Sequence, residues 1–243
     1  MIGSLFKKKK NFKGLLSTTD LHSHLLPGID DGVQSIEESL DVIKGFINLG
    51  FRKLVTTPHI MHDFYKNDGE IILDKLAEVR HALVEAALEI EIEAAAEYYL
   101  DEYFIDLINS DSKLLTFGDN YVLFELSFMS KPLTLKEAVF SMQTKGYKPV
   151  LAHAERYLYY HDSIKDLEEL SNNGVLLQLN LLSLSGYYSK SVKKMAIKLI
   201  EQKMISFIGS DCHNANQLIA IAELLNSAAM NPLKDQNFLN NRL

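Results

Sequence analysis

The stretch TTDLHSHLLPGIDDGVQSIEESLDVIKGFINL, residues 18–49, contains one complete example of the unit from which the chain is built. Residues 18–24 are predicted to form a short buried strand, because a Pro-Gly turn follows them. Ser35 and Glu38 then have the spacing of a helix capping box, and apolar residues recur along one face of residues 35–49. The stretch therefore predicts a strand, a polar loop and a helix.

The same alternation of strand and helix recurs along the rest of the chain. Further strands are expected over residues 53–57, 91–97, 121–126, 148–153, 175–180 and 205–209. Further helices are expected over residues 70–89, 101–109, 134–145, 163–173, 189–203 and 214–229. Seven strand–helix units in a row predict a parallel sheet with right-handed crossovers. We therefore expect one α/β domain, a closed or nearly closed barrel.

The composition limits which classes of protein the chain can belong to. With 243 residues, 47% hydrophobic and 23% charged, the chain is typical of a globular protein and has the length of a barrel-type domain. The lone Cys212 excludes an intrachain disulfide and suits a reducing compartment. No apolar run approaches the roughly 20 residues that a membrane-spanning helix needs. We expect a cytoplasmic protein with no membrane span.

Charge is distributed unevenly. The net charge is −7, yet residues 1–13 carry five lysines and no acid. Residues 1–16 are expected to be a basic, flexible tail, with the folded domain over 17–243, and the tail lacks the apolar core of a signal peptide. Weak attraction of this tail to an anionic membrane surface or an acidic partner is the alternative. The acidic domain argues against nucleic-acid binding, which needs basic residues.

Metal-ligating residue types lie at the ends of most of the expected strands, where a parallel barrel collects its functional groups. They are His22, His24, His59, Glu97, Glu125, His153, Asp211 and His213. Residues i and i+2 on a strand share a face, so the first two and the last two can each converge on one ion. A lone histidine pair could instead be bonded to the backbone. Clustered buried carboxylates repel without cations, and this mixture of nitrogen and oxygen donors suits Mn²⁺, Fe²⁺, Zn²⁺ or Mg²⁺.

Several motifs resemble a known family. DLHSH at 20–24, with LPGIDDG at 26–32, resembles the first motif of the polymerase-and-histidinol-phosphatase (PHP) superfamily. Within it, the chain resembles the bacterial metal-dependent tyrosine-protein phosphatases that accompany the tyrosine kinases of capsule and exopolysaccharide export. The motifs that carry this second resemblance are TTPH at 56–59, AEYY at 96–99, FELS at 124–127, HAERY at 153–157 and SDCHN at 210–214.

This resemblance implies a distorted (β/α)7 barrel of the PHP type that holds two or three divalent ions, most commonly Mn²⁺. The ligands it implies are His22, His24, Asp31, His59, Glu97, Glu125, His153, Asp211 and His213. Of the two adjacent acids, the family pattern selects Asp31, which leaves Asp30 to orient the loop. Asp20 would be the acid that holds a ligating imidazole.

The resemblance implies hydrolysis of phosphotyrosine in proteins, with a bacterial tyrosine kinase as the expected substrate. A metal-bound water would be the nucleophile. A cysteine phosphatase needs Cys, five residues and Arg, but Leu218 occupies that position after Cys212, so that mechanism is excluded. Cys212 is expected to pack on the opposite face of its strand.

Arg156 is the candidate phosphate clamp, because its guanidinium matches phosphate oxygens. An ion pair with Glu155 or another acid is the alternative. Related sequences often carry another arginine after the SDCHN motif, and this chain has none there.

Two other functions stay open at this point. One is a small-molecule phosphatase of the histidinol-phosphate kind from the same superfamily. The other is a metal-filled but inactive module that docks a kinase or a polysaccharide-export protein. A nuclease is the least favoured function, because no basic groove is evident. The oligomeric state is not indicated.

Overall fold

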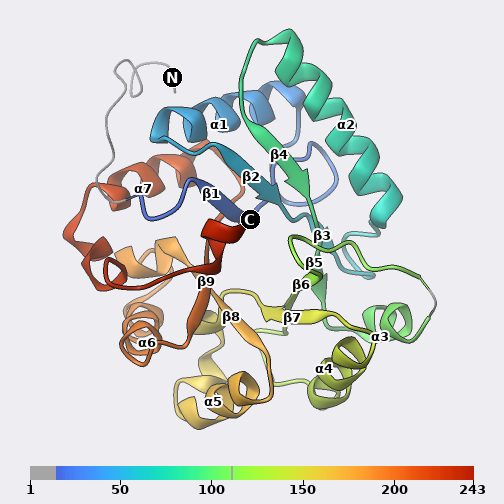
Figure 1. The fold of residues 1–243 in the computed structure, drawn as a ribbon, viewed down its shortest axis with the longest axis vertical. Coiled ribbons are helices and arrows are strands. Elements are labelled where there is room, and N and C mark those ends of the chain that lie inside the picture. Colours follow the sequence, from blue (N-terminus) through green and yellow to red (C-terminus); the bar gives the residue numbers. More distant parts are fainter. Residues whose placement is uncertain (1–14, 111) are drawn as a thin grey trace.

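The computed structural model describes residues 15–110 and 112–243, so most of the expected basic tail, 1–16, lies outside the described residues. Leu15 and Leu16, at its end, are half-buried and pack against the core. Figure 1 shows the strands in the middle of the molecule and the helices around them. Among the described residues, none of the helices combines the length and the apolar character that crossing a bilayer requires.

The helices form where their capping signals predict. They are α1 (Ile36–Leu49), α2 (Gly69–Glu85), α3 (Glu102–Asn109), α4 (Leu135–Thr144), α5 (Ile164–Asn172), α6 (Lys190–Glu201) and α7 (Ala215–Leu225). The Ser35 side chain caps α1 by accepting from the Glu38 backbone N–H, and Gly50 ends the helix in the left-handed conformation. All seven expected helices are confirmed, with ends shifted by a few residues.

The strands form one parallel sheet in the order β3-β5-β6-β7-β8-β9-β1-β2-β4. They are β1 (Thr19–Ser23), β2 (Lys53–Thr56), β3 (His59–Ile60), β4 (Glu91–Ala94), β5 (Glu97–Tyr99), β6 (Tyr121–Glu125), β7 (Lys148–Leu151), β8 (Leu176–Asn180) and β9 (Ile205–Cys212). All seven expected strands are observed, and two further short strands, β3 and β5, follow β2 and β4 after a break, so segments 53–60 and 91–99 each contain two strands. Pro58 lies at one break and has no N–H to donate to a ladder.

The two divided strands close the barrel. Segment 53–60 pairs with segment 91–99 in a single register, with Lys53 opposite Glu91 and His59 opposite Glu97. At one end of the sheet β2 pairs with β1 and β4 with β2, and at the other end β5 pairs with β6 and β3 with β5. The two ends of the sheet are thus the same two chain segments. This arrangement confirms the expected α/β barrel and shows where it is distorted.

One layer of side chains inside the barrel is apolar. A buried cluster is formed by inward-facing residues of the strands and two neighbouring segments, namely Leu21, Val55, Ala95, Phe117, Leu123, Val150, Ala152 and Phe207. Two residues further along, the inward positions become polar: Glu97 follows Ala95, and Glu125 follows Leu123. Because side chains alternate along a strand, each pair shares the inward face. The apolar layer is therefore the floor of a polar site at the carboxyl ends of the strands.

Candidate functional site

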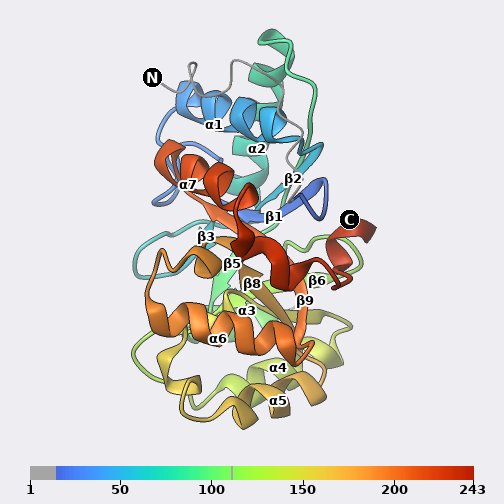
Figure 2. The same ribbon diagram turned by 90° about the vertical axis from the view of Figure 1, so that its left-hand side faces the viewer.

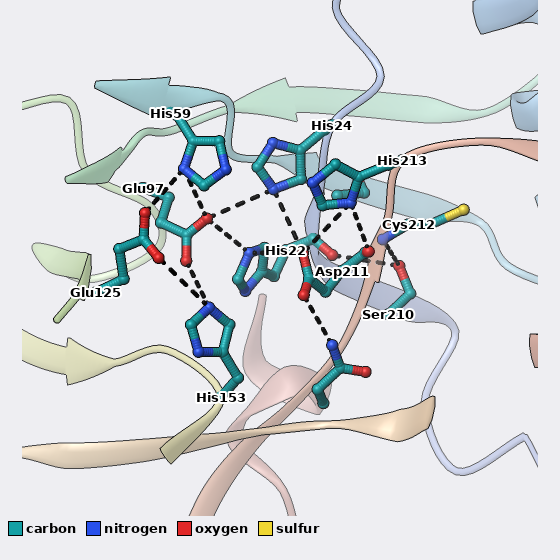
Figure 3. A network of polar contacts seen from close by, with 12 residues as sticks. His22, His24, His59, Glu97, Glu125, His153, Ser210, Asp211, Cys212 and His213 are labelled. Atoms are coloured by element: carbon teal, nitrogen blue, oxygen red, sulfur yellow. Dashed lines mark hydrogen bonds and ion pairs between the residues drawn. The ribbon is translucent and has the colours of Figure 1, made fainter. Parts of the chain in front are cut away.

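All nine residues expected to bind metal lie around one cavity at the carboxyl ends of the strands. Figure 3 shows five of them, the histidines, arranged around Glu97 and Asp211. Their ligand atoms form four groups in which all atoms lie within 4.8 Å of one another. These groups are His24–Asp31–His59–His213, His22–His24–Asp211, His22–Glu97–His153 and His59–Glu97–Glu125. Adjacent groups share a residue, so the arrangement suits neighbouring ions with shared ligands.

Three of these residues have backbone that a regular strand does not allow. His22, His153 and Asp211 have φ angles of 78°, 33° and 50°, in the region that disfavours residues other than glycine. Leu21 and Ala152, immediately before the two histidines, already point into the barrel. The positive φ breaks the alternation, so two consecutive side chains face inward. His22 and His24 do converge, with ring centroids 5.4 Å apart, but not through the regular strand pleat that we expected.

Glu97 is a central carboxylate of the site. Its Oε2 lies 3.0 Å from His22 Nε2 and 3.3 Å from His59 Nδ1, while its Oε1 lies 3.0 Å from His153 Nε2. The residue is completely buried. Since its two oxygens face different histidines, Glu97 would be able to supply an oxygen donor to both of the candidate groups to which it belongs.

The two carboxylate oxygens of Asp211 have different partners. Oδ1 faces His22 Nε2 at 3.3 Å and His24 Nε2 at 3.5 Å. Oδ2 accepts hydrogen bonds from Arg156 Nη1 at 2.9 Å and from Asn180 Nδ2 at 2.8 Å. The second pair of contacts fixes the carboxylate and leaves Oδ1 directed into the site.

The loop after β1 brings two acids over the histidines. Asp30 Oδ2 accepts from His24 Nδ1 at 2.7 Å, and Asp30 Oδ1 accepts from the Gly32 N–H. Asp31 Oδ1 lies 3.5 Å from His59 Nε2. A Cβ on Gly32 would lie 2.2 Å from the His24 carbonyl oxygen, so only glycine lets this loop fold back so closely.

Asp20 does not have the role that we expected. It accepts from the Ser210 hydroxyl at 2.7 Å and from the Ser210 N–H at 3.0 Å, and thus ties β1 to β9. Burial raises the pKa of its carboxyl to about 8, against the lowering effect of these hydrogen bonds. The acid that holds a site imidazole is Asp30, so the prediction for Asp20 is wrong.

The electrostatics show why such a cluster needs cations. Burial would raise the pKa of Glu97, but the charged His22 and His59 beside it outweigh burial and hold it well below its usual range. Burial likewise opposes the lowering of the Asp211 pKa by His22. Conversely, burial would lower the pKa of His59, but Glu97 outweighs it and raises the pKa to about 9. Without metal, protons on the histidines therefore supply the positive charge that the carboxylates require.

The donor set fits divalent metal ions. His24 Nε2 and His59 Nδ1 are buried and have no hydrogen-bond partner among the described residues, although both face Glu97 Oε2. Buried imidazole nitrogens without a partner are costly unless something else binds them. His22 Nδ1 faces Gln178 Oε1 at 3.2 Å, which favours the tautomer whose Nε2 lone pair points into the site.

Arg156 lies at the wall of the cavity, not against Glu155. Its guanidinium is held between two rings, 4.3 Å from the centroid of Tyr188 and 4.8 Å from that of Phe128. Glu155 is buried elsewhere, where its Oε1 accepts from the Ser183 hydroxyl at 2.6 Å. The Glu155 ion pair is therefore not formed, and Asp211 is the acid that Arg156 contacts.

The cavity has a volume of about 580 Å³ and combines the polar site with an apolar rim. Phe128, Met129 and Tyr99 line it beside Glu125 and His153. Met129 is 90% exposed and Phe128 is 44% exposed. A ring attached to a phosphoryl group can therefore contact apolar side chains while its phosphoryl group faces the polar floor.

Sequence reasoning missed four residues of the site. Gln178 accepts from the His153 N–H at 2.7 Å, and Asn180 holds Asp211. Gln217 lines the cavity, and its Oε1 accepts from the His213 N–H at 2.6 Å. Phe128 stacks on His153 with centroids 5.6 Å apart. Glutamine, asparagine and phenylalanine are common in loops and strands, so no spacing signal distinguished them.

Two residues left out of the expected ligand set also stay outside it in the structure. Cys212 is fully buried in the main apolar core, on the opposite face of β9 from Asp211, as expected. Burial raises the pKa of its thiol, so the neutral form is favoured. His62 stacks on Tyr103 with centroids 5.1 Å apart and belongs to none of the four groups.

Known proteins resemble this chain over most of its length. Residues 18–226 match the family described as capsular polysaccharide synthesis, CpsB/CapC. The tyrosine-protein phosphatase YwqE of Bacillus subtilis (strain 168) is 29% identical over 197 residues, which cover 80% of this chain and 77% of that protein. The tyrosine-protein phosphatase CpsB of Streptococcus pneumoniae is 30% identical over 203 residues, which cover 80% of this chain and 82% of CpsB.

The fold is also shared with solved proteins. A chain from the crystal structures of YwqE and CpsB, described there as unique metal-dependent tyrosine phosphatases, superposes with a TM-score of 0.77 at 24% identity. The match covers 90% of this chain and 96% of that one. These matches confirm the resemblance that the motifs indicated. Because the family match spans residues 18–226, this chain belongs to the CpsB/CapC family of capsular polysaccharide synthesis.

Proposed function

We propose that the chain is a metal-dependent phosphatase that removes the phosphoryl group from phosphotyrosine in proteins. The observation that carries the proposal is the convergence of nine nitrogen and oxygen donors, in four overlapping groups, on a cavity that Arg156 also lines. The tyrosine-protein phosphatase names of the relatives favour this reaction over hydrolysis of a small phosphate ester.

The nine residues would hold two or three divalent ions, with Mn²⁺ as the first candidate and Fe²⁺, Zn²⁺ or Mg²⁺ as the others. Bound ions supply Lewis acidity, which acidifies water to make a nucleophile and neutralises charge on the phosphoryl oxygens. Glu97 and Asp211, which both face His22, would supply carboxylate oxygens to these ions. Asp30 and Gln178 would fix the rings of His24 and His22.

Arg156 would bind a phosphoryl oxygen. Among the residues that the structure describes, Nη1 donates the only hydrogen bond of the guanidinium, to Asp211. The rings of Phe128 and Tyr188 fix the plane of the guanidinium. Gln217 would add a second, neutral donor: its Oε1 is held by the His213 N–H, and its amide N–H groups have no partner among the described residues. This donor would act where related sequences have an arginine.

The substrate ring would lie against the apolar rim formed by Phe128, Met129 and Tyr99. We take a bacterial tyrosine kinase in the cytoplasm as the substrate, and residues 17–243 as the catalytic unit. The buried, protonated state favoured for Cys212 fits a reaction without a cysteine nucleophile.

The test compares three phosphorylated peptides of one sequence, which carry phosphotyrosine, phosphoserine or phosphothreonine, with the protein loaded with Mn²⁺. We expect hydrolysis of the phosphotyrosyl peptide, at least tenfold slower hydrolysis of the other two, and loss of activity on chelation. A His22→Ala or Asp211→Ala variant should be inactive. Faster hydrolysis of histidinol phosphate than of the phosphotyrosyl peptide would refute the protein-phosphatase proposal, and inactivity of the Mn²⁺-loaded protein on all substrates would indicate a docking module.

A further inference from the structure

We propose that helix α6 carries a docking surface for acidic residues that flank the phosphotyrosine of the substrate. The surface is the lysine row, defined as Lys190, Lys194 and Lys198. This inference rests on the proposed function, because it concerns how a protein substrate is selected at the same cavity. Its evidence is separate, since none of these lysines belongs to the metal-binding groups.

The lysine row is continuous and exposed. Its members are spaced four residues apart on one helix, so they lie on one face and span about 12 Å along the axis. The opposite face, which includes Met195 and Leu199, is buried. Figure 2 shows α6 lying lengthwise on the outside of the molecule. All three lysines are exposed, and none has an ion-pair or hydrogen-bond partner among the described residues.

Lys198 lies in the last turn of α6, where a positive charge is favourable, but the charge at the start of the helix is not. Its first turn contains lysine and no acid, although the positive end of the helix dipole favours acids there. Like charges four residues apart also repel. By contrast, α1, α2 and α3 all have acids in their first turns. An anionic ligand on α6 would offset both the unfavourable charge at the start of the helix and the repulsion between the lysines.

The lysine row starts beside the cavity. Tyr188 lines the cavity two residues before Lys190, and it stacks on Arg156. The short 3-10 helix η2 (Ala154–Arg156) packs against α6. A chain leaving the cavity past Tyr188 therefore reaches the lysine row within a few residues. Since an extended chain advances about 3.3–3.6 Å per residue, the row would accommodate about four of them.

Charge complementarity selects the partner. The protein as a whole carries −7, so an acidic segment is repelled by most of the molecule and attracted by this face. An exposed ion pair changes an affinity by up to about fivefold, and salt screens it. Three such pairs should give a preference of about ten- to fiftyfold for an acidic substrate at low ionic strength.

The test uses two phosphotyrosyl peptides that differ only on one flank, with four glutamates or four glutamines, made in both orientations. Activity is measured as kcat/KM, and binding as fluorescence anisotropy of the labelled peptides. The triple variant Lys190→Glu, Lys194→Glu, Lys198→Glu is compared with the wild type. A matched control, Lys44→Glu, Lys113→Glu, Lys165→Glu, changes the net charge equally at exposed lysines outside α6.

We expect the wild type and the control to prefer the acidic peptide at least tenfold in one orientation, through KM, and to lose the preference at 0.5 M salt. The α6 variant should lose the preference but hydrolyse para-nitrophenyl phosphate at the wild-type rate. Equal use of both peptides by the wild type, or equal losses in both variants, would overturn the proposal. A further outcome would also overturn it: sedimentation of the wild type, but not of the α6 variant, with phosphatidylserine vesicles, together with no preference between the peptides. That result would assign the lysine row to membrane binding. If no phosphate ester is hydrolysed, the proposed function fails, and anisotropy still decides whether α6 binds the acidic peptide.

Discussion

Replacing Arg156 by alanine tests the phosphate-binding arrangement most directly. In the proposed function the guanidinium would contribute a charge-assisted hydrogen bond to the substrate, worth about 1.5–3 kcal/mol, so kcat/KM should fall about 10- to 100-fold. The variant also removes one of the two donors that hold Asp211 Oδ2, and leaves only Asn180. Loss of a group that orients a metal ligand typically weakens metal binding about 10- to 100-fold. The loss of phosphate binding must therefore be measured separately from the loss of metal binding.

The assay measures kcat/KM on a phosphotyrosyl peptide across a Mn²⁺ titration. If Arg156 binds the phosphoryl group, the loss should persist at saturating metal. If it acts only by orienting Asp211, the loss should disappear there. Arg156→Lys should recover only part of the activity, because it restores charge without the planar fork that fits between Phe128 and Tyr188. Arg52→Ala, which removes an exposed guanidinium elsewhere, is the matched control. Wild-type kinetics for Arg156→Ala at saturating metal would refute the assignment.

Four further outcomes are expected. Cys212→Ser should keep kcat within about twofold, because the thiol is buried away from the cavity; a large loss at full metal occupancy would implicate the thiol in the chemistry. Asp30→Asn should weaken metal binding about 10- to 100-fold by releasing His24 Nδ1, and calorimetry that finds wild-type affinity would contradict this role. Gln217→Glu keeps the acceptor for the His213 N–H but replaces the free amide donor by an anion, so the inhibition constant of inorganic phosphate should rise about tenfold with metal content unchanged. Metal binding at pH 7.5 should release at least one proton per chain, because Glu97 outweighs burial and raises the His59 pKa to about 9 in the metal-free protein. Heats of binding that do not depend on the ionisation enthalpy of the buffer would disprove that release.

The fold was predictable because its signals are local and repeat. Caps such as Ser35 and terminators such as Gly50 mark helix ends without reference to the rest of the molecule. The division of two strands was not predictable, because segments 53–60 and 91–99 both read as strands over most of their length. What divides them is pairing at the two ends of the sheet: β2 of the first segment pairs with β1, and β5 of the second segment pairs with β6. This constraint is tertiary and leaves little trace in the sequence apart from Pro58.

The candidate ligands were predictable for a different reason. Histidine, aspartate and glutamate are unusual at the buried ends of strands, so their repeated occurrence there is informative. The groups that orient them carry no such signal. Gln178 lies within the one expected strand without a ligand type, and only the folded chain shows its contacts with His22 and His153. The resemblance implied that Asp20 holds a site imidazole, whereas the loop after β1 returns Asp30 to His24 and Asp20 bonds Ser210.

The places where strand periodicity fails are informative about the energetics of the site. His22, His153 and Asp211 each hold a positive φ, which costs about 1–3 kcal/mol for a residue other than glycine. Buried carboxylates and imidazoles with unpartnered nitrogens add a further cost. Packing of the apolar layer beneath the site can hold this backbone in place, but it does not offset the cost in free energy of the positive φ angles and the buried polar groups. Cations that bind the folded site and not the unfolded chain would offset this cost, because such binding stabilises the fold by RT ln(1 + L/Kd), where L is the free metal concentration. Strain, buried charge and unpartnered nitrogens therefore occur together in one site, where a bound metal cluster would offset all three.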